Sequence, residues 1–367
     1  MRPILSLLNL AAILLVLSLA FSCNSISKSD NSVNSKQSTS APSKMIPEIK
    51  SIEEFEMPSS IRAIQAINDS TCWFTGSDGV YGYTEDGGKN WKIDSIKNGL
   101  IAPQFRAISV TKEAVHLLSV ASPALLYRSV DKGENWDLVY TENNPGIFYD
   151  AMKFWDDQHG IAMGDPITNC LSVIKTSDGG KTWLKLDCTQ LPETAPGEAA
   201  FAASNSNIAI IGKHVWMVSG GRKARVFYSP DKGTNWEAFN TPIIEGETMT
   251  GIFSVDFANE KDGMIIGGNW EAQTENKGNK AKTNDGGKTW TLVSEGNGPG
   301  YRSRIAHKNG WWLAVGMPGI SISNDQGESW TPLNEEAWYA ADWNQNSNSV
   351  WLSGKNKVGL MHFKSAD

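Results

Sequence analysis

The sequence predicts an all-β protein: a single seven-bladed β-propeller of four-stranded antiparallel blades, closed by N- and C-terminal strands in one blade. Three observations predict it. One eight-residue motif occurs six times, short apolar or alternating runs surround every copy, and no apolar period of useful helical length is found. Repeats spaced by tens of residues indicate a solenoid or a propeller, and four short strands per repeat favour the propeller.

The repeated motif has the form Ser/Thr-x-Asp-x-Gly-x-x-Trp, as in TSDGGKTW at 176–183. Its aspartates are Asp86, Asp131, Asp178, Asp231, Asp285 and Asp325. Hydroxyl and carboxylate oxygens accept hydrogen bonds from the amides of a turn, and glycine tolerates a positive φ. We therefore expect each copy to be a structural turn between the third and fourth strands of a blade, not a catalytic or metal site.

The spacing of the motif defines the blades. Six complete repeats are predicted at 60–95, 104–140, 147–188, 198–240, 248–294 and 300–333. A seventh stretch at 338–363 repeats only the first three strands. We expect the run EIKSIEEF at 48–55 to supply its missing outer strand, because such closure leaves no open sheet edge.

The N-terminal residues are predicted to lie outside the propeller. Residues 1–22 combine a short positive start with an apolar run, which is typical of a secretory signal peptide. Residues 23–46 are rich in Ser, Asn, Lys and Gln, and such a segment buries too little apolar surface to fold, so we expect a flexible tether. The propeller is then expected to occupy 47–367.

The segment LAFSC ending at Cys23 resembles the lipobox of bacterial lipoproteins, although Phe21 stands where a small residue is more usual. The resemblance implies a lipidated Cys23, and a plain signal peptide is the alternative. We expect an exported monomer held by its lipid in a bacterial envelope membrane, with the outer membrane or periplasmic side favoured. Net charge is −7 with acids and bases interspersed, which argues against a nucleic-acid partner.

Two further cysteines lie symmetrically about the third motif, at Cys170 and Cys188. If the motif is a hairpin turn, the two side chains face each other across adjacent strands. A disulfide is compatible with an exported protein, and two opposed free thiols also fit the pattern. Cys72 is expected to be a small buried side chain.

The candidate site lies where the innermost strand of each blade begins, on the face to which propeller ligands usually bind. Alignment of the repeats on their aspartates places six candidate ligand-binding residues there: Arg62, Arg106, Tyr149, Arg302, Arg304 and Tyr339. The candidate catalytic carboxylates are Asp150, Asp165 and Glu198, and Trp270 lies in a loop of the same face. Guanidinium groups bind carboxylates in a bidentate manner, but arginines that only neutralise acids in a water-filled channel fit equally well.

The motif resembles the Asp-box, or bacterial neuraminidase repeat, found in sialidases, sortilin-type receptors and photosystem II assembly/stability factors. The stretch WWLAVGMPGISISNDQGESW at 311–330 resembles most clearly the single propellers of the last group. That resemblance implies Asp-boxes on the outer rim and a non-enzymatic assembly platform. We expect a protein or glycan partner to bind at the central polar face.

A sialidase-like or other glycoside hydrolase or lyase, acting on a carboxylated sugar, is the alternative. It requires two carboxyl groups across a pocket, about 5–9.5 Å apart. The Arg-Ile-Pro signature of sialidases is missing from SIRAIQ at 60–65. The five histidines lack metal-ligand spacing and no cofactor motif is found, so we expect neither metal nor cofactor, and an oxidoreductase is not supported.

Overall fold

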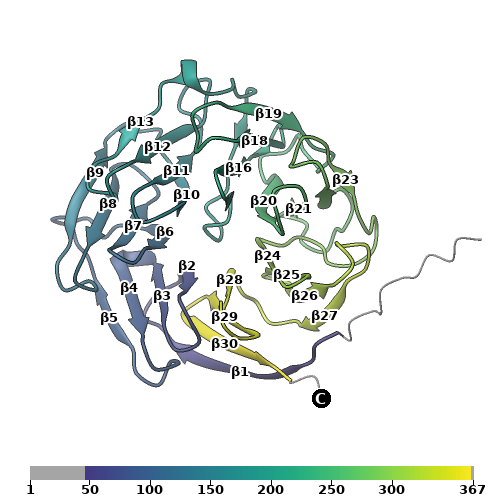
Figure 1. The fold of residues 1–367 in the computed structure, drawn as a ribbon, viewed down its shortest axis with the longest axis horizontal. Helices are drawn as coiled ribbons and strands as arrows, with labels where there is room; N and C mark the ends of the chain where they lie inside the picture. Colours follow the sequence, from purple (N-terminus) through teal and green to yellow (C-terminus); the bar gives the residue numbers. More distant parts are fainter. Residues whose placement is uncertain (1–45, 365–367) are drawn as a thin grey trace, which may run out of the picture. The chain divides into compact units, whose positions relative to one another are not determined.

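The computed structural model describes residues 46–364, which form seven β-sheets arranged as a ring (Figure 1). The predicted all-β, seven-bladed propeller is confirmed. Within these residues the only helical segments are two 3₁₀ turns, η1 (Ser77–Gly79) and η2 (Cys188–Gln190), and no helix is long and apolar enough to cross a bilayer. The predicted signal peptide, Cys23 and nearly all of the tether lie outside the described residues.

Five blades follow one pattern, in which four strands are paired in chain order from the ring centre outwards. The first three blades comprise β2 (Ile61–Ala66), β3 (Cys72–Gly76), β4 (Val80–Thr84) and β5 (Lys92–Ser95); β6 (Phe105–Val110), β7 (Val115–Ser119), β8 (Ala124–Ser129) and β9 (Asp137–Glu142); and β10 (Tyr149–Phe154), β11 (Gly160–Gly164), β12 (Ser172–Thr176) and β13 (Leu184–Lys185). Blades five and six comprise β20 (Thr250–Phe257), β21 (Gly263–Asn269), β22 (Lys280–Thr283) and β23 (Thr291–Leu292); and β24 (Arg304–Lys308), β25 (Trp311–Gly316), β26 (Gly319–Ser323) and β27 (Thr331–Asn334).

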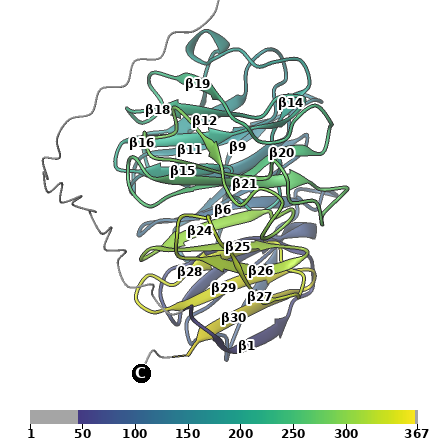
Figure 2. The same ribbon diagram turned by 90° about the vertical axis from the view of Figure 1, so that its right-hand side faces the viewer.

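The seventh blade closes the ring with strands from both ends of the described chain. Its inner strands are β28 (Ala340–Trp343), β29 (Ser349–Gly354) and β30 (Lys357–Phe363). The outer strand is β1 (Ile49–Glu56), which pairs antiparallel with β30 (Figure 2). The predicted closure by the run at 48–55 is therefore confirmed, and the sheet that would otherwise end at β30 gains a covering strand.

Blade four departs from the pattern. Its strands are β15 (Ile208–Ile211), β16 (His214–Val218), β18 (Arg225–Ser229) and β19 (Glu237–Asn240), so the inner strand begins at residue 208 rather than at the predicted 198. Residues 198–199 instead form β14 (Glu198–Ala199), which pairs with β17 (Gly220–Gly221). Because Gly220 also pairs with Gly251 of β20, these two short strands extend the sheet of blade five to six strands.

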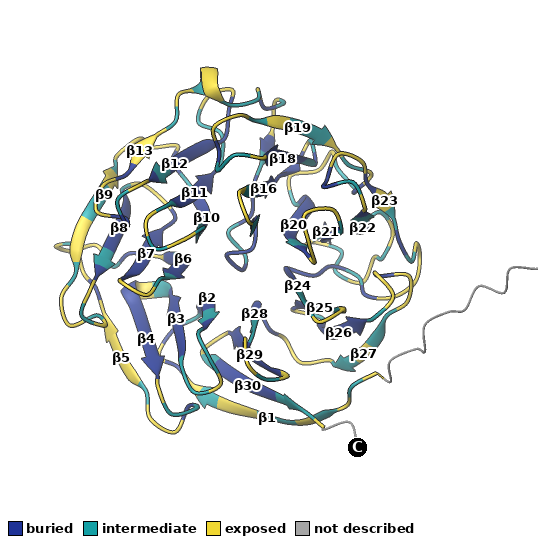
Figure 3. Cartoon of the chain, viewed as in Figure 1, coloured by how far each residue is buried: buried dark blue, intermediate teal, exposed yellow. Residues whose placement is uncertain are grey.

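Burial follows from the way the blades stack. Middle strands such as β3, β11 and β29 are buried along their whole length, since blades cover both of their faces. Outer strands such as β5 and β13 are exposed (Figure 3). The sequences of the middle strands are therefore largely apolar without alternation, as is usual for strands buried on both faces.

The Asp-box turns have the hydrogen bonds that their residue types predict. In the third box, Thr176 Oγ1 donates to Asp178 Oδ1 at 2.8 Å and accepts from the amide of Gly180 at 3.0 Å. Asp178 also accepts from the amide and the hydroxyl of Thr182, at 3.0 and 2.7 Å. The bond from the Ser or Thr hydroxyl to the aspartate recurs in the other five boxes.

Each box also lies against the blade that precedes it in the chain. Gly133 has φ +85°, and a Cβ at this position would lie 2.8 Å from Cε2 of Tyr81, whose hydroxyl donates to the Gly133 carbonyl at 2.8 Å. In the fifth box, Trp216 Nε1 donates to the Gly286 carbonyl at 2.8 Å. The motif glycine therefore satisfies both a left-handed turn and a close approach between blades.

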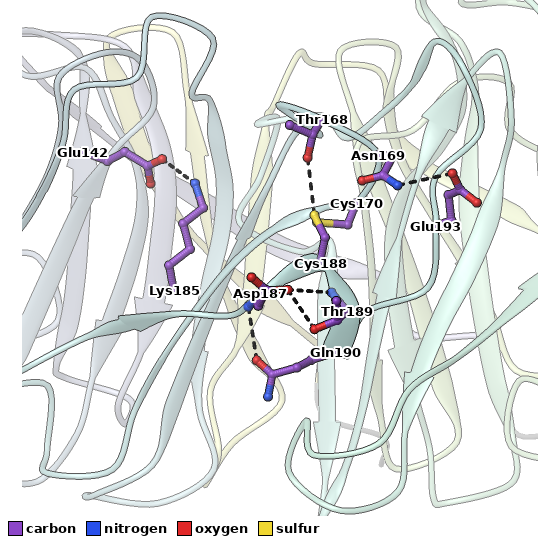
Figure 4. The surroundings of a disulfide bond; sticks show 10 residues. All are labelled: Glu142, Thr168, Asn169, Cys170, Lys185, Asp187, Cys188, Thr189, Gln190 and Glu193. Carbon is purple, nitrogen blue, oxygen red and sulfur yellow. Dashed lines mark hydrogen bonds and ion pairs between the residues drawn. A yellow bond between two sulfur atoms is a disulfide. The ribbon is translucent and has the colours of Figure 1, made fainter.

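A disulfide joins Cys170 and Cys188, whose Cα atoms lie 5.5 Å apart (Figure 4). It links the end of the β11–β12 loop to η2, which follows the outer strand of blade three. Asp187 caps η2 by accepting from the Thr189 amide at 2.9 Å. The free cysteine of the described chain, Cys72, is buried as expected.

We expect the Asp-boxes to make the propeller sensitive to acid. Hydrogen bonds from the side chain and then the amide of Asn135 lower the pKa of Asp131 to about 2. Because this value lies below that of an unfolded aspartate, the stabilisation is complete above about pH 4 and is lost as pH falls towards 2. Asp131→Asn should be less stable at pH 7 and lose less stability between pH 4 and pH 2, as measured by urea unfolding followed by circular dichroism. Equal losses in this variant and in the exposed control Asp137→Asn would contradict the assignment.

The disulfide should stabilise the fold by restricting the unfolded chain. The cysteines have a sequence separation of 18, so replacing both by serine should lower the free energy of unfolding by about 3 kcal/mol. Urea unfolding with and without dithiothreitol provides the measurement. Reductant should destabilise the natural protein and leave the double serine variant unchanged; an unchanged natural protein would contradict a stabilising role.

Candidate functional site

The residues that precede the inner strand of blade four cross the central channel. We call residues 198–207 the crossing segment. Asp165 Oδ1 accepts from the amide of Ala200 at 2.6 Å, and Arg106 Nη1 donates to the Ala202 carbonyl at 3.3 Å. These bonds attach the crossing segment to blades three and two.

The second half of the crossing segment is attached as firmly. The side chain of Asn205 accepts from the Met152 amide at 2.9 Å and donates to the Ile108 carbonyl at 2.8 Å. Ser204 Oγ donates to the Ser303 carbonyl at 2.6 Å, next to blade six. The segment is therefore anchored to several inner strands, which surround the ring centre in Figure 1.

The crossing segment lines two cavities that share no lining residue. The first, which we call the central pocket, has a volume of about 440 Å³ and is lined by residues 199–203 of the segment. The second, the opposite cavity, has a volume of about 500 Å³ and is lined by Ser204 and Asn205. The segment thus lies between the two cavities.

One side of the central pocket is polar. Arg62 places its guanidinium 3.9 Å from the ring centroid of Tyr339, a cation–π contact, and both residues line the pocket together with Asp165. No hydrogen bond or ion pair of the Arg62 side chain to any residue in 46–364 is found, and its buried Nε lacks a partner. A guanidinium left without an acceptor in a pocket is available to an anionic group of a ligand.

Arg106 and Asp150 do not line the central pocket, but their charges affect its polar side. Burial, and next to it the nearby Arg62, lower the pKa of Arg106 to about 10, so Arg106 remains a cation at neutral pH. Asp150 is fully buried, and neither of its carboxyl oxygens has a hydrogen-bond partner. Burial, with the neighbouring Asp165, raises its pKa well above the ordinary value, so the neutral acid is favoured.

The other side of the central pocket is apolar. Phe201 of the crossing segment stacks on Phe253 with ring centroids 3.9 Å apart, and Tyr301 meets Phe253 edge-on at 4.8 Å. Trp270 and Met317 come from the second-to-third-strand loops of blades five and six and remain 43% and 38% exposed. The pocket therefore combines a cationic side from blades one and seven with an apolar side from blades four to six.

Several predicted site residues lie elsewhere. Tyr149 is buried inside the blades, where its hydroxyl donates to Glu142 at 2.9 Å and burial raises its pKa. Arg302 is also buried, and its Nη1 donates to the Tyr301 carbonyl at 2.9 Å. Arg304 lines the opposite cavity, 3.6 Å from Asp342. Alternate residues of a strand point to opposite sides, so a position at the start of a strand does not by itself place a side chain in the pocket.

Glu198 was predicted to begin the inner strand of blade four. It does not begin that strand, and it does not line the central pocket. It is buried, pairs with Arg225 Nη2 at 2.5 Å and accepts from Ser219 Oγ at 2.5 Å. The alignment placed it wrongly because the extra residues of blade four precede the inner strand rather than follow it. Its carboxylate is held by these partners and serves the structure.

The apolar side contains residues that the sequence did not single out, namely Phe201, Phe253, Tyr301 and Met317. From sequence alone, apolar side chains near the start of propeller strands are interpreted as part of the hydrophobic core. Only the tertiary structure therefore shows that these residues line a pocket. The available signal for the crossing segment was the interval from Asp178 to Asp231, which at 53 residues is the first of two intervals (53 and 54) longer than the 45 and 47 before them. Within residues 46–364, no group of three His, Cys, Asp or Glu side chains is arranged to hold a metal ion.

Fold and site together define a seven-bladed Asp-box propeller whose central pocket has one polar and one apolar side. Comparison with known proteins gives a consistent result: the family model of the photosynthesis system II assembly factor YCF48 matches residues 48–183. The chain is 25% identical over 265 residues to the photosystem II assembly lipoprotein Ycf48 of Synechococcus sp. (strain CC9902), covering 70% of each chain. It is 27% identical over 128 residues to the chloroplastic photosystem II stability/assembly factor HCF136 of Arabidopsis thaliana, covering 34% of this chain and 28% of that one.

Solved structures share the fold. YCF48 bound to D1 peptide has a TM-score of 0.63 at 16% identity, covering 87% of this chain and all of that one. YCF48 from Cyanidioschyzon merolae has a TM-score of 0.61 at 14% identity, covering 85% and 98%. The WD40 repeats of RRP9 reach 0.63 at 10% identity, covering 87% and 99%, so the structural likeness concerns the fold alone. With the sequence matches, the predicted resemblance to photosystem II assembly factors is confirmed.

We expect Asp165 to destabilise the protein when it ionises. Burial raises its pKa to about 6, and the hydrogen bond from Ala200 opposes this only in part. The folded state therefore binds more protons than the unfolded chain between about pH 4 and pH 6, and stability falls as pH rises through that window.

Asp165→Asn keeps the acceptor for Ala200 and removes the charge. Its stability relative to the natural protein should increase by about 2–3 kcal/mol between pH 4 and pH 7, measured by urea unfolding. The same difference at both pH values would show that Asp165 titrates normally.

Proposed function

We propose that this protein is an exported, lipid-anchored propeller that acts as a non-enzymatic binding or assembly platform for a protein partner. The partner binds at the central pocket. The observation that carries this proposal is the pairing, in one pocket, of a guanidinium without an acceptor and a partly exposed apolar wall. Such a surface matches the mixed polar and apolar chemistry of a polypeptide.

The relatives support the same kind of role. The Synechococcus sp. (strain CC9902) protein is named an assembly lipoprotein, and a YCF48 structure contains a bound D1 peptide. The lipobox-like segment ending at Cys23 supports an N-terminal lipid anchor here as well. We place the propeller on the outer membrane or periplasmic side of a bacterial envelope, as a monomer, with its pocket presented to other envelope proteins.

A glycoside hydrolase is less well supported. It needs two carboxyl groups that reach a bound sugar from opposite sides of a cleft. Asp150 is fully buried, and Glu198 is buried in its ion pair with Arg225. Of the three candidate carboxylates, Asp165 alone lines the central pocket. A glycan partner bound without catalysis is tested in the same experiment as the protein partner.

Binding by the full-length lipidated protein in nanodiscs tests the proposal. The probes are an array of peptides tiled across the exported and membrane proteins of the producing bacterium, and an array of sialylated glycans. We expect selective peptide binding that Arg62→Ala weakens about tenfold or more, because removing one partner of a desolvated charged contact costs about 2 kcal/mol or more.

Lys181→Ala is the matched control, because it removes an exposed cation from an Asp-box turn on the outer rim. Its peptide affinities should equal those of the natural protein. Failure of every peptide to bind would overturn the proposal, and so would binding of sialylated glycans with release of free sialic acid.

A further inference from the structure

The apolar wall of the central pocket is larger than a purely electrostatic anion site requires. Phe201, Phe253 and Tyr301 form its buried base, with exposures of 9%, 2% and 2%. Trp270 and Met317 form its rim. Leaving large apolar side chains in water has a free-energy cost, which a ligand recovers when it covers them.

The rim side chains come from loop segments between strands. The amide of Trp270 donates to the Met249 carbonyl at 3.0 Å, which ties the β21–β22 loop to the start of β20. Met317 lies in the two-residue turn between β25 and β26. Tryptophan and methionine are enriched at interfaces because they supply large contact surfaces, and methionine adapts its shape to a partner.

The polar side limits what the ligand carries. Arg62 stacks on Tyr339 and has no acceptor among the described residues, so a bound group with a negative charge would be its partner. The two sides line one cavity of about 440 Å³. A ligand that fits both must place an apolar group and an anionic group close together.

The crossing segment limits the space that a ligand has in the central pocket. Ala199 to Ala203 line the pocket, and the segment is bonded to blades two and three. A ligand group that enters the pocket therefore meets the crossing segment.

We infer that the central pocket recognises a protein segment by one large apolar side chain, seated between Phe201, Trp270 and Met317, beside a carboxylate bound by Arg62. This inference rests on the proposed function and specifies its partner. The carboxylate comes either from an acidic side chain or from the C-terminus of the segment. The apolar wall accounts for most of the selectivity for the large apolar side chain that lies next to this carboxylate.

The test uses full-length protein and a position-scanning peptide library in which each position is varied through all residues, with free and amidated C-termini. Fluorescence anisotropy measures affinity. We expect a preference for Phe, Leu, Met or Trp at one position and for Asp, Glu or a free C-terminus next to it. Trp270→Ser should weaken the selected peptide about tenfold or more, as truncation of a central interface tryptophan does.

Met317→Ser is the second variant, so that the test survives if Trp270→Ser is poorly folded, which thermal unfolding reveals. Leu138→Ser is the matched control, because Leu138 is 45% exposed on the outer strand β9, away from the pocket. Both pocket variants should lose the apolar preference and show a less negative heat-capacity change of binding, whereas the control should not.

The outcomes separate this inference from the proposed function. Peptide binding that depends on Arg62 but not on Trp270 or Met317 would overturn the apolar anchor and leave the platform intact. An apolar preference without any acidic or C-terminal preference would overturn the pairing with a carboxylate. The absence of binding to all peptides would overturn both proposals.

Discussion

The structure depends on the contact between each Asp-box turn and the preceding blade. Inside the turn, a hydroxyl and a carboxylate accept the amides that a tight loop leaves unpaired, as Thr176 and Asp178 do. Outside it, the motif glycine lies against a large side chain of the neighbour, as Gly133 lies on Tyr81. The same residues therefore both stabilise the turn and pack it against the neighbouring blade. A repeat that achieves both can be copied around a ring, and β1 closes the last gap by pairing with β30.

The candidate site arises where one repeat departs from this pattern. Blade four carries extra residues, and the crossing segment uses them to span the channel and divide it into two cavities. Its amide at Ala200 fixes Asp165, its carbonyl at Ala202 binds Arg106, and Phe201 begins the apolar wall. The propeller thus provides a rigid frame, and a single irregular segment provides the floor of the pocket. Binding without catalysis fits this arrangement because Asp150 and Glu198 are buried and do not line the central pocket.

Electrostatics in the pocket favour an anionic ligand. Arg106 remains cationic at neutral pH. Burial raises the pKa of Asp150 well above its ordinary value, which removes a negative charge that would otherwise offset the arginines, whereas Asp165, with a pKa of about 6, is largely ionised at neutral pH. Arg62 is left with an aromatic face rather than a carboxylate as its neighbour. A ligand carboxylate would therefore meet a cation that has no competing ion pair among the described residues.

The sequence by itself determined the architecture: the number of blades, the closing strand and the turn chemistry. These features are encoded locally, because each motif contains both the hydrogen-bonding groups and the glycine that its turn requires. It also identified Arg62, Arg106, Asp165 and Tyr339 as residues near one another. Only the tertiary structure decided that Tyr149 and Arg302 point into the blades, that Arg304 faces the opposite cavity, and that Glu198 is held by Arg225. The reason is physical: one residue of register reverses the side of a strand that a side chain occupies, and the path of an inserted segment depends on contacts with distant blades.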